Sequence, residues 1–354
     1  MRCTNTGITA SNTTNSRTKL RGLGALLVCL GVPCGAATLQ PFEAVEPHMG
    51  SLVRIKLYAP DATRAKAGFE AAFGRIAALD QKLSDYRDDS ELNRLCAAAV
   101  GHPVKVSEDL FRVLWASQKL AEQTDGTFDI TLGPVIRLWR QARLDRIHPS
   151  PDALQEARSR CGFRKLHLDR GNRTARLDQA GMRLDLGGIA KGYAAGEALE
   201  ALNRLGITRA LVAASGDLAF SHAPPGRRGW TIGLDSLDRP DAPFSRVLEL
   251  SDAAVSTSGD TEQYVEIGGK RYSHIIDSAT GEAVDGKLTV SVVARRGMTA
   301  DSLATAVYLL GAARGLPLLK KYPGAAAIVV ARDGAIIESP GFSRLPQRRK
   351  PVAP

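Results

Sequence analysis

The most informative stretch of the sequence is residues 183–193, Arg-Leu-Asp-Leu-Gly-Gly-Ile-Ala-Lys-Gly-Tyr. The alternating Arg-Leu-Asp-Leu predicts a strand, the glycine pair a tight turn, and residues 189–205 a long helix. A helix N-terminus offers unpaired N–H groups and positive potential, which suit a phosphate. The spacing matches neither common phosphate loop. Glycines at such a turn also serve packing alone, but Lys191 at the start of the helix favours an anion site.

Outward from this turn, helices and strands follow one another without regular alternation. The pattern predicts helices over 60–83, 107–123, 151–160 and 300–313. It predicts strands over 51–58, 165–168, 174–178, 210–214, 230–234, 246–250, 263–267, 271–276, 288–294 and 325–330. Most strands fall in the second half of the chain, so the expected class is α+β.

Length and charge bound the function. The chain has 354 residues, which allows one large domain or two. Its 47 Lys and Arg exceed its 37 Asp and Glu by ten. Residues 1–37 and 343–354 hold eight of these basic residues and no acid, so the remainder is nearly neutral. The sequence therefore does not indicate a core that binds nucleic acid.

The N-terminal segment predicts export. Basic residues at 17–21 precede an apolar run at 23–32 and small residues at 35–37, which is the order of a signal peptide. We expect residues 1–37 to be a disordered N-terminus and export signal, 38–342 to be the folded domain, and 343–354 to be a basic, Pro-rich tail. The expected compartment is the periplasm. An uncleaved anchor in the inner membrane, or a lipid anchor on Cys34, is the alternative.

The cysteines give little guidance. After the leader only Cys96 and Cys161 remain, with no Cys/His cluster that would hold zinc. An exported compartment permits a disulfide between them. Their spacing neither requires nor excludes it.

Two further segments carry chemistry. Asp301 and Thr305 lie four residues apart, on one face of a predicted helix, where both can offer oxygen to a hard cation such as Mg²⁺. A helix-terminal acid and an ordinary buried threonine would look the same. His274 ends a predicted strand and alternates in side with Ile275, so it can face a cleft as a general base. A structural histidine is the alternative.

Taken together, these segments resemble the ApbE family of exported flavin transferases, which move FMN from FAD onto a protein threonine. Counterparts of the family's landmarks follow in its order, at 49–51, 84–86, 126–131, 185–193, 256–260, 274–281 and 300–305. The matches at 185–193 and 274–281 are specific. The sequence departs from the family pattern at Ser51, Thr127, Ser215 and Ser278-Ala279. Ser215 matters most, because it replaces a glycine and serine rarely adopts a positive φ.

The resemblance implies a compact two-part, T-fold-like body with FAD in the crevice between the parts. It implies a FAD cleft lined by Met49, Tyr86, Thr127, Phe128, Asp129, Asp185, Lys191 and the His274-Ile275 pair. It implies Mg²⁺ on the carbonyl of Gly188, Asp301 and Thr305. For the chemistry, His274 is the expected base and Asp277 the second candidate.

The expected reaction is transfer of FMN to an exported or membrane redox protein, with release of AMP. Water in place of the threonine would make the same site a FAD diphosphatase. A non-catalytic flavin-binding protein and an exported carbohydrate- or peptide-binding module remain as other classes. Neither of those needs His274 and Asp301 together, so the sequence favours an enzyme.

Overall fold

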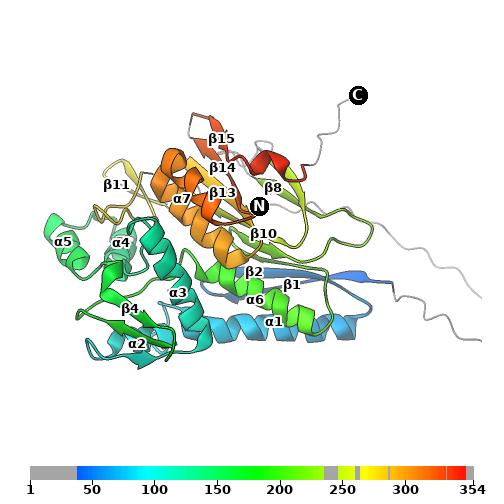
Figure 1. The fold of residues 1–354 in the computed structure, drawn as a ribbon, viewed down its shortest axis with the longest axis horizontal. Helices are drawn as coiled ribbons and strands as arrows, with labels where there is room; N and C mark the ends of the chain where they lie inside the picture. Colours follow the sequence, from blue (N-terminus) through cyan, green and yellow to red (C-terminus); the bar gives the residue numbers. More distant parts are fainter. Residues whose placement is uncertain (1–37, 235–245, 260–263, 286–287, 332, 348–354) are drawn as a thin grey trace, which may run out of the picture.

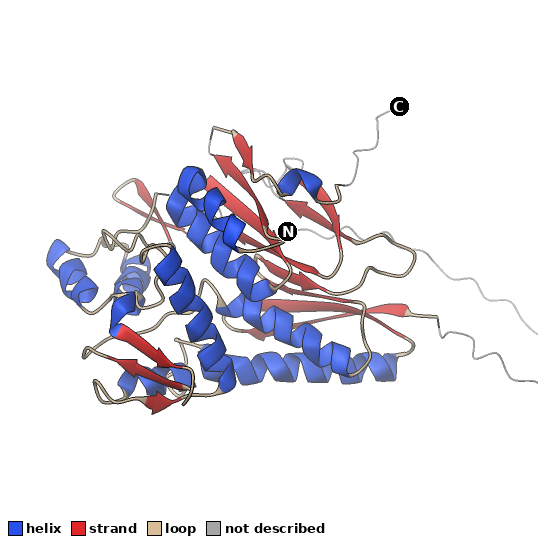
Figure 2. Ribbon diagram, viewed as in Figure 1, coloured by secondary structure: helices blue, strands red, loops and turns tan. Residues whose placement is uncertain are grey.

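A fully antiparallel, eight-stranded sheet forms the centre of the molecule (Figures 1 and 2). The computed structural model describes residues 38–234, 246–259, 264–285, 288–331 and 333–347. The strand order is β1-β2-β6-β7-β10-β13-β14-β15. The strands are β1 (Gln40–His48), β2 (Ser51–Ala59), β6 (Ala210–Ala214), β7 (Asp217–Phe220), β10 (Ala253–Ser258), β13 (Leu288–Ala294), β14 (Ala326–Ala331) and β15 (Ile336–Glu338).

Three long helices cover one face of this sheet: α1 (Ala62–Leu83), α6 (Ala190–Arg204) and α7 (Gly297–Leu318). Strand β2 shows why they pack there. Its alternate residues Val53, Ile55 and Leu57 are buried, and they join α1 and α6 in one hydrophobic cluster. Burial of each such side chain contributes roughly 1.5–3 kcal/mol. The period-2 pattern of β2 thus selects the face on which the helices lie.

Helices α6 and α7 cross at two glycines. A Cβ atom on Gly192 or on Gly297 would overlap the carbonyl oxygen of the other residue. The two backbones therefore touch, which brings the start of α6 against the first turns of α7. This crossing positions the candidate site.

The opposite face of the sheet is covered by the hairpin β8 (Trp230–Leu234) and β9 (Arg246–Leu250). The 3-10 helix η3 (Phe342–Arg344) also packs there, with Phe342 fully buried. Glu249 N–H donates to the carbonyl of Pro346 at 2.9 Å, so the folded body continues to residue 347, beyond the expected boundary at 342. Residues 348–354 of the predicted tail and residues 1–37 of the predicted leader lie outside the described residues.

A smaller part lies beside the helices, at the left of Figure 1. Its helices are α2 (Glu91–Ala97), α3 (Glu108–Gln123), α4 (Gly133–Asp145) and α5 (Pro151–Ser159). Its strands are β3 (Val104–Lys105), β4 (Leu166–Asp169) and β5 (Thr174–Leu177), with the 3-10 turn η1 (Phe163–Lys165) before β4. The hairpin β11 (Tyr264–Ile267) and β12 (Lys270–Ser273) packs on α4 in a separate hydrophobic cluster.

The α+β class is confirmed, and most predicted elements are present within one to three residues of the expected bounds. The strand predicted over 183–186 is wrong: Arg183 makes one isolated bridge to Leu132, and Asp185 N–H donates to the carbonyl of Ile130. The strand predicted over 271–276 ends at Ser273. Strands β1, β7 and β10 and helices α2 and α4 were not predicted. Short, mostly buried segments such as β7 have no alternation to detect.

Two other features concern the membrane and the cysteines. The segment Gly297–Lys321 is long and apolar enough to cross a membrane by length and composition. Half of that window is buried inside the fold, as in the core helix of a soluble domain. Cys96 and Cys161 are both free thiols, and they pack against different hydrophobic clusters.

Candidate functional site

Helix α6 begins at Ala190, directly after the glycine pair Gly187-Gly188, and its first turn faces α7. Gly188 lies so close to Thr305 that an added Cβ would be 3.0 Å from the Thr305 hydroxyl oxygen. No side chain caps the start of α6. The predicted metal-binding residues Gly188, Asp301 and Thr305 are therefore neighbours at this crossing.

A buried group of charges lies at the same place. Lys191 Nζ is 3.9 Å from Asp217 Oδ2, and Asp217 Oδ1 accepts a hydrogen bond of 2.6 Å from the Ser256 hydroxyl. Asp301 Oδ2 accepts the N–H of Gly192 at 2.9 Å. Both acids are almost fully buried, with 5% and 4% of Asp217 and Asp301 exposed. Two carboxylates thus share one lysine.

The excess of carboxylates over positive charge affects the pKa values of both acids. Burial, and then the charge of Asp217, raise the pKa of Asp301 well above its usual value, although Lys191 opposes the shift. Burial likewise raises the pKa of Asp217. A second cation beside these carboxylates would stabilise their ionised forms.

The oxygen atoms at this point are of the kind that a hard cation binds. The Thr305 hydroxyl lies 3.3 Å from the hydroxyl of Ser258 on β10, and Asp301 stands one turn before it on α7. With the nearby backbone of Gly188 these groups supply only oxygen, which Mg²⁺ prefers over nitrogen or sulfur. Among the described residues no cluster of three His, Cys, Asp or Glu side chains exists, so a metal here would depend on hydroxyl and backbone oxygen.

Next to this crossing, Asp185 anchors an arginine. Arg140 on α4 donates to Asp185 Oδ2 at 2.6 Å, pairs with Asp85, and lies over the ring of Tyr86 with its guanidinium carbon 4.0 Å from the ring centre. Tyr86 is 70% exposed, so one face of the ring stays accessible. Burial raises the pKa of Asp185 to about 6. Asp185 therefore orients Arg140 and, through it, Tyr86.

The predicted site residues at 127–129 differ in burial and in hydrogen bonding. Phe128 is buried in the main hydrophobic cluster, and Thr127 is half-buried at the turn after α3. Asp129 accepts from Thr131 and from the N–H of Phe163 at 3.0 Å. Asp129 therefore holds a loop together through its side-chain oxygens.

The segment after β12 carries the proposed base. His274 is half-buried, while Ile275 is buried in the main cluster, as the alternation predicted. Asp277 Oδ1 accepts the N–H groups of Ala279 at 2.7 Å and Thr280 at 3.3 Å. Its carboxylate thus shapes the turn that follows His274. Sequence spacing alone does not distinguish this structural role from that of a general base.

Met49 occupies the turn between β1 and β2. It has a φ of 50°, in the left-handed region, and its side chain packs against both large hydrophobic clusters. A thioether adapts to irregular contacts, and here it joins the sheet to the smaller part.

Sequence reasoning missed Asp217, Ser256 and the two arginines Arg140 and Arg143. Asp217 follows a loop that differs from the family pattern, and its partner Ser256 lies on a strand that was not predicted. The arginines lie on α4, which was not predicted either. A helical reading of 133–145, with Pro134 in its first turn, would have placed both arginines on one face.

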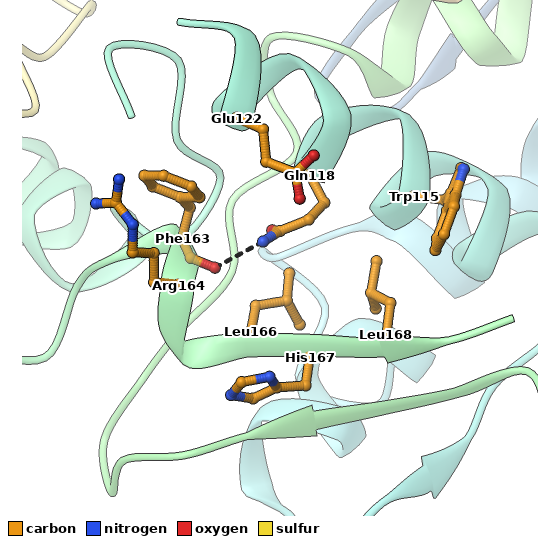
Figure 3. Close-up of a pocket in the computed structure, with 8 residues that line it drawn as sticks. All are labelled: Trp115, Gln118, Glu122, Phe163, Arg164, Leu166, His167 and Leu168. Carbon is orange, nitrogen blue, oxygen red and sulfur yellow. Dashed lines mark hydrogen bonds between the residues drawn. The ribbon is translucent and has the colours of Figure 1, made fainter. Parts of the chain in front are cut away.

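Two surface hollows lie elsewhere. One has a volume of about 520 Å³ and lies between α3 and β4, where Gln118 Nε2 donates to the carbonyl of Phe163 at 2.9 Å. Figure 3 shows the residues that line it. A second, of about 630 Å³, lies beside β9 and β13. Neither is lined by a predicted site residue, so we base the site on the charged groups at the α6–α7 crossing.

Known proteins similar to this chain are flavin transferases. The chain is 34% identical over 336 residues to a FAD:protein FMN transferase of Treponema pallidum (strain Nichols), covering 90% of this chain and 93% of the relative. A relative of the same name from Haemophilus influenzae is 30% identical and covers 77% of this chain and 81% of its own length.

Solved structures show the same fold. The flavin transferase ApbE from Vibrio cholerae superposes with a TM-score of 0.79 at 27% identity, over 87% of this chain and 100% of that one. The flavinyl transferase ApbE of Pseudomonas stutzeri gives 0.75 at 30% identity, over 87% and 96%. The sequence model of the ApbE family matches residues 49–329, which include every predicted site residue. The chain therefore belongs to the ApbE family.

Proposed function

We propose that the protein is a FAD:protein FMN transferase that moves FMN from FAD to a threonine hydroxyl of an acceptor protein and releases AMP. The observation that carries the proposal is the group at the α6–α7 crossing. There the half-buried Lys191 lies with the buried carboxylates of Asp217 and Asp301, beside the Thr305 hydroxyl. Buried charges of this kind, with shifted pKa values, are typical of functional sites.

We propose that the same site takes Mg²⁺ through Asp301, Thr305 and the carbonyl of Gly188. The fit is supported by the all-oxygen donor set and by the raised pKa of Asp301, whose carboxylate has too little positive charge around it. When bound, such an ion neutralises charge that develops on the diphosphate and acts as a Lewis acid.

The chain's own groups supply the rest. Lys191 brings a positive charge to the diphosphate. His274 takes the proton of the threonine hydroxyl as its oxygen bonds to the FMN-side phosphorus. The phosphorus–oxygen bond to the AMP phosphate breaks, and AMP leaves with that electron pair. Tyr86 offers an exposed aromatic face for the flavin ring, held from the other side by Arg140.

The acceptor is proposed to be an exported or membrane redox protein, reached in the periplasm or from an anchor in the inner membrane. The support is the predicted export signal at 17–37. Comparing the mass of the mature protein from a periplasmic fraction with that of the full chain tests this part separately.

The central experiment incubates the protein with FAD, Mg²⁺ and candidate exported redox subunits, followed by mass measurement of each protein. A gain of one FMN on a threonine of a subunit, with AMP released, supports the transferase. FMN and AMP released without any modified protein would show a FAD diphosphatase instead. No turnover of FAD, with binding retained, would identify a non-catalytic flavin-binding protein.

A further inference from the structure

Arg143 on the last turn of α4 has a buried nitrogen without a partner. Its Nε is shielded from solvent and makes no hydrogen bond. Its Nη2 reaches only the carbonyl oxygen of Ser273, at 3.5 Å. No acid of the described residues forms an ion pair with it. Burial lowers the pKa of Arg143, the nearby charge of Arg140 lowers it too, and the hydroxyl of Tyr86 acts the other way.

Arg140, one turn earlier on the same helix, is the opposite case. It pairs with both Asp85 and Asp185 and lies on the ring of Tyr86. Both nearby acids are therefore used by the first arginine. The second guanidinium remains half-buried with no counter-charge, which costs free energy unless an anion joins it.

The position of Arg143 indicates which anion it binds. Ser273, whose carbonyl it reaches, immediately precedes the proposed base His274. Tyr86, the proposed contact of the flavin ring, is near enough to Arg143 to raise its pKa. In the proposed reaction the hydroxyl that the base deprotonates attacks the FMN-side phosphorus. The group between the flavin ring and the base is therefore the phosphate of FMN. A planar guanidinium matches the oxygen atoms of a phosphate with two parallel hydrogen bonds.

We propose that Arg143 binds the FMN-side phosphate of FAD. This binding residue lies outside all of the family motifs described above. The inference rests on the proposed function. The metal and Lys191 then act at the α6–α7 crossing, and Arg143 acts from α4 on the same substrate. Arg143 distinguishes phosphorylated from unphosphorylated flavins.

The test measures binding of riboflavin, FMN and FAD to the full protein by flavin fluorescence. Riboflavin has the same ring as FMN without the phosphate. For Arg143→Gln we expect FMN and FAD to bind roughly tenfold to a hundredfold more weakly, since hydrogen bonds to charged groups are worth this much. Riboflavin binding stays unchanged. Arg143→Lys, which keeps the charge, recovers part of the loss.

Arg137→Gln is the matched control, because Arg137 lies exposed on the same helix and the substitution removes the same charge. It leaves all three affinities unchanged, and thermal melting checks that both variants fold. An equal loss for riboflavin would overturn the proposal by showing that Arg143 only shapes the ring site. Unchanged FMN and FAD affinities would overturn it as well. Absence of flavin transfer by the wild-type protein would refute the proposed function, whereas the binding series judges Arg143 by itself.

Discussion

Two buried charged clusters lie on helix α6, two residues apart, and they are built in opposite ways. At Tyr193, the carboxylate of Asp109 accepts from Arg75 at 2.5 and 2.9 Å, from Lys82 at 2.6 Å, and from the Tyr193 hydroxyl at 2.8 Å. At Lys191, one lysine lies 3.9 Å from Asp217 and also offsets the charge of Asp301. We call the first the Asp109 cluster and the second the Lys191 cluster.

The pKa values follow this difference. Hydrogen bonds, first from Arg75, hold the pKa of Asp109 far below its usual value. Burial raises that of Asp301. A carboxylate surrounded by donors serves to join α1, α3 and α6, whereas a carboxylate short of positive charge can receive a cation. Charge balance, not burial, therefore separates the Asp109 cluster from the proposed functional cluster at Lys191.

The largest expected effect concerns Asp301. Asp301→Ala abolishes Mg²⁺-dependent flavin transfer, because it removes the only full negative charge among the proposed ligands. Thr305→Ala weakens the dependence on Mg²⁺ less. Turnover is measured against Mg²⁺ concentration, with Asp152→Ala, an exposed acid on α5, as the control. Undiminished wild-type turnover in excess chelator would contradict the proposal that the Lys191 cluster receives a cation.

The second effect concerns the base. His274→Ala lowers flavin transfer at least about a hundredfold, the usual worth of general-base assistance, while FAD affinity changes little. A single-turnover assay with bound FAD separates the two quantities. His102→Ala, at an exposed position, serves as the control. If transfer continues at the wild-type rate, Asp277 becomes the candidate to examine.

The third effect is on stability and concerns the Asp109 cluster. Asp109→Asn leaves Arg75 and Lys82 without their shared carboxylate, and breaking a buried pair of this kind costs about 3 kcal/mol. Denaturant unfolding measures it, and the neighbouring Glu108→Gln, which loses an exposed pair with Arg112, should cost under about 1 kcal/mol. If Asp109→Asn lost flavin transfer without losing stability, the structural role that we assign to the Asp109 cluster would be wrong.

The fourth effect is a pH dependence of opposite sign in two acids, measured with chelator present. Because the pKa of folded Asp185 is raised to about 6, its contribution to stability is present at low pH and is lost as pH rises through about 6. The pKa of Asp109 is lowered, so its contribution is lost as pH falls below the ordinary range of aspartate.

The measurement compares the free energy of unfolding of wild type and Asp185→Asn. Their difference should shift against the wild type by on the order of 1–3 kcal/mol between pH 4 and pH 7. A difference that does not change with pH would show that Asp185 titrates normally in the folded protein.

The smallest effect concerns the turn that delivers Asp217 to the Lys191 cluster. Ser215 has a φ of 55°, so the family's usual glycine is explained by the backbone, and serine adopts the same left-handed conformation at a cost. Ser215→Gly should stabilise the protein by about 0.5 kcal/mol with transfer unchanged. Ser251→Gly, at an exposed loop residue without positive φ, should give no gain. Chemical denaturation measures both.

Much of the fold could be predicted from local sequence patterns, and the proposed reacting groups come from the sequence as well. The apolar period-2 and period-3.6 patterns located β2, α1, α3 and α6, because burial of alternate or helically spaced residues is a local property. The specific segments 185–193 and 274–281 predicted Lys191 and His274 as site residues, and the segment 300–305 predicted the metal ligands Asp301 and Thr305. Asp301 and Thr305 share a face by helical spacing alone.

Which charged groups come into contact depends on the tertiary structure. Asp217 lies 26 residues after Lys191 along the chain, yet the β6–β7 turn brings it close to the lysine in space. The same is true of Asp109 with Arg75, and of Arg143 with the carbonyl before His274. Charge balance depends on long-range contacts and on burial, and neither is encoded in local spacing. The sequence therefore named the groups, and the packing of α4, α6 and α7 decided which of them are left in need of a ligand.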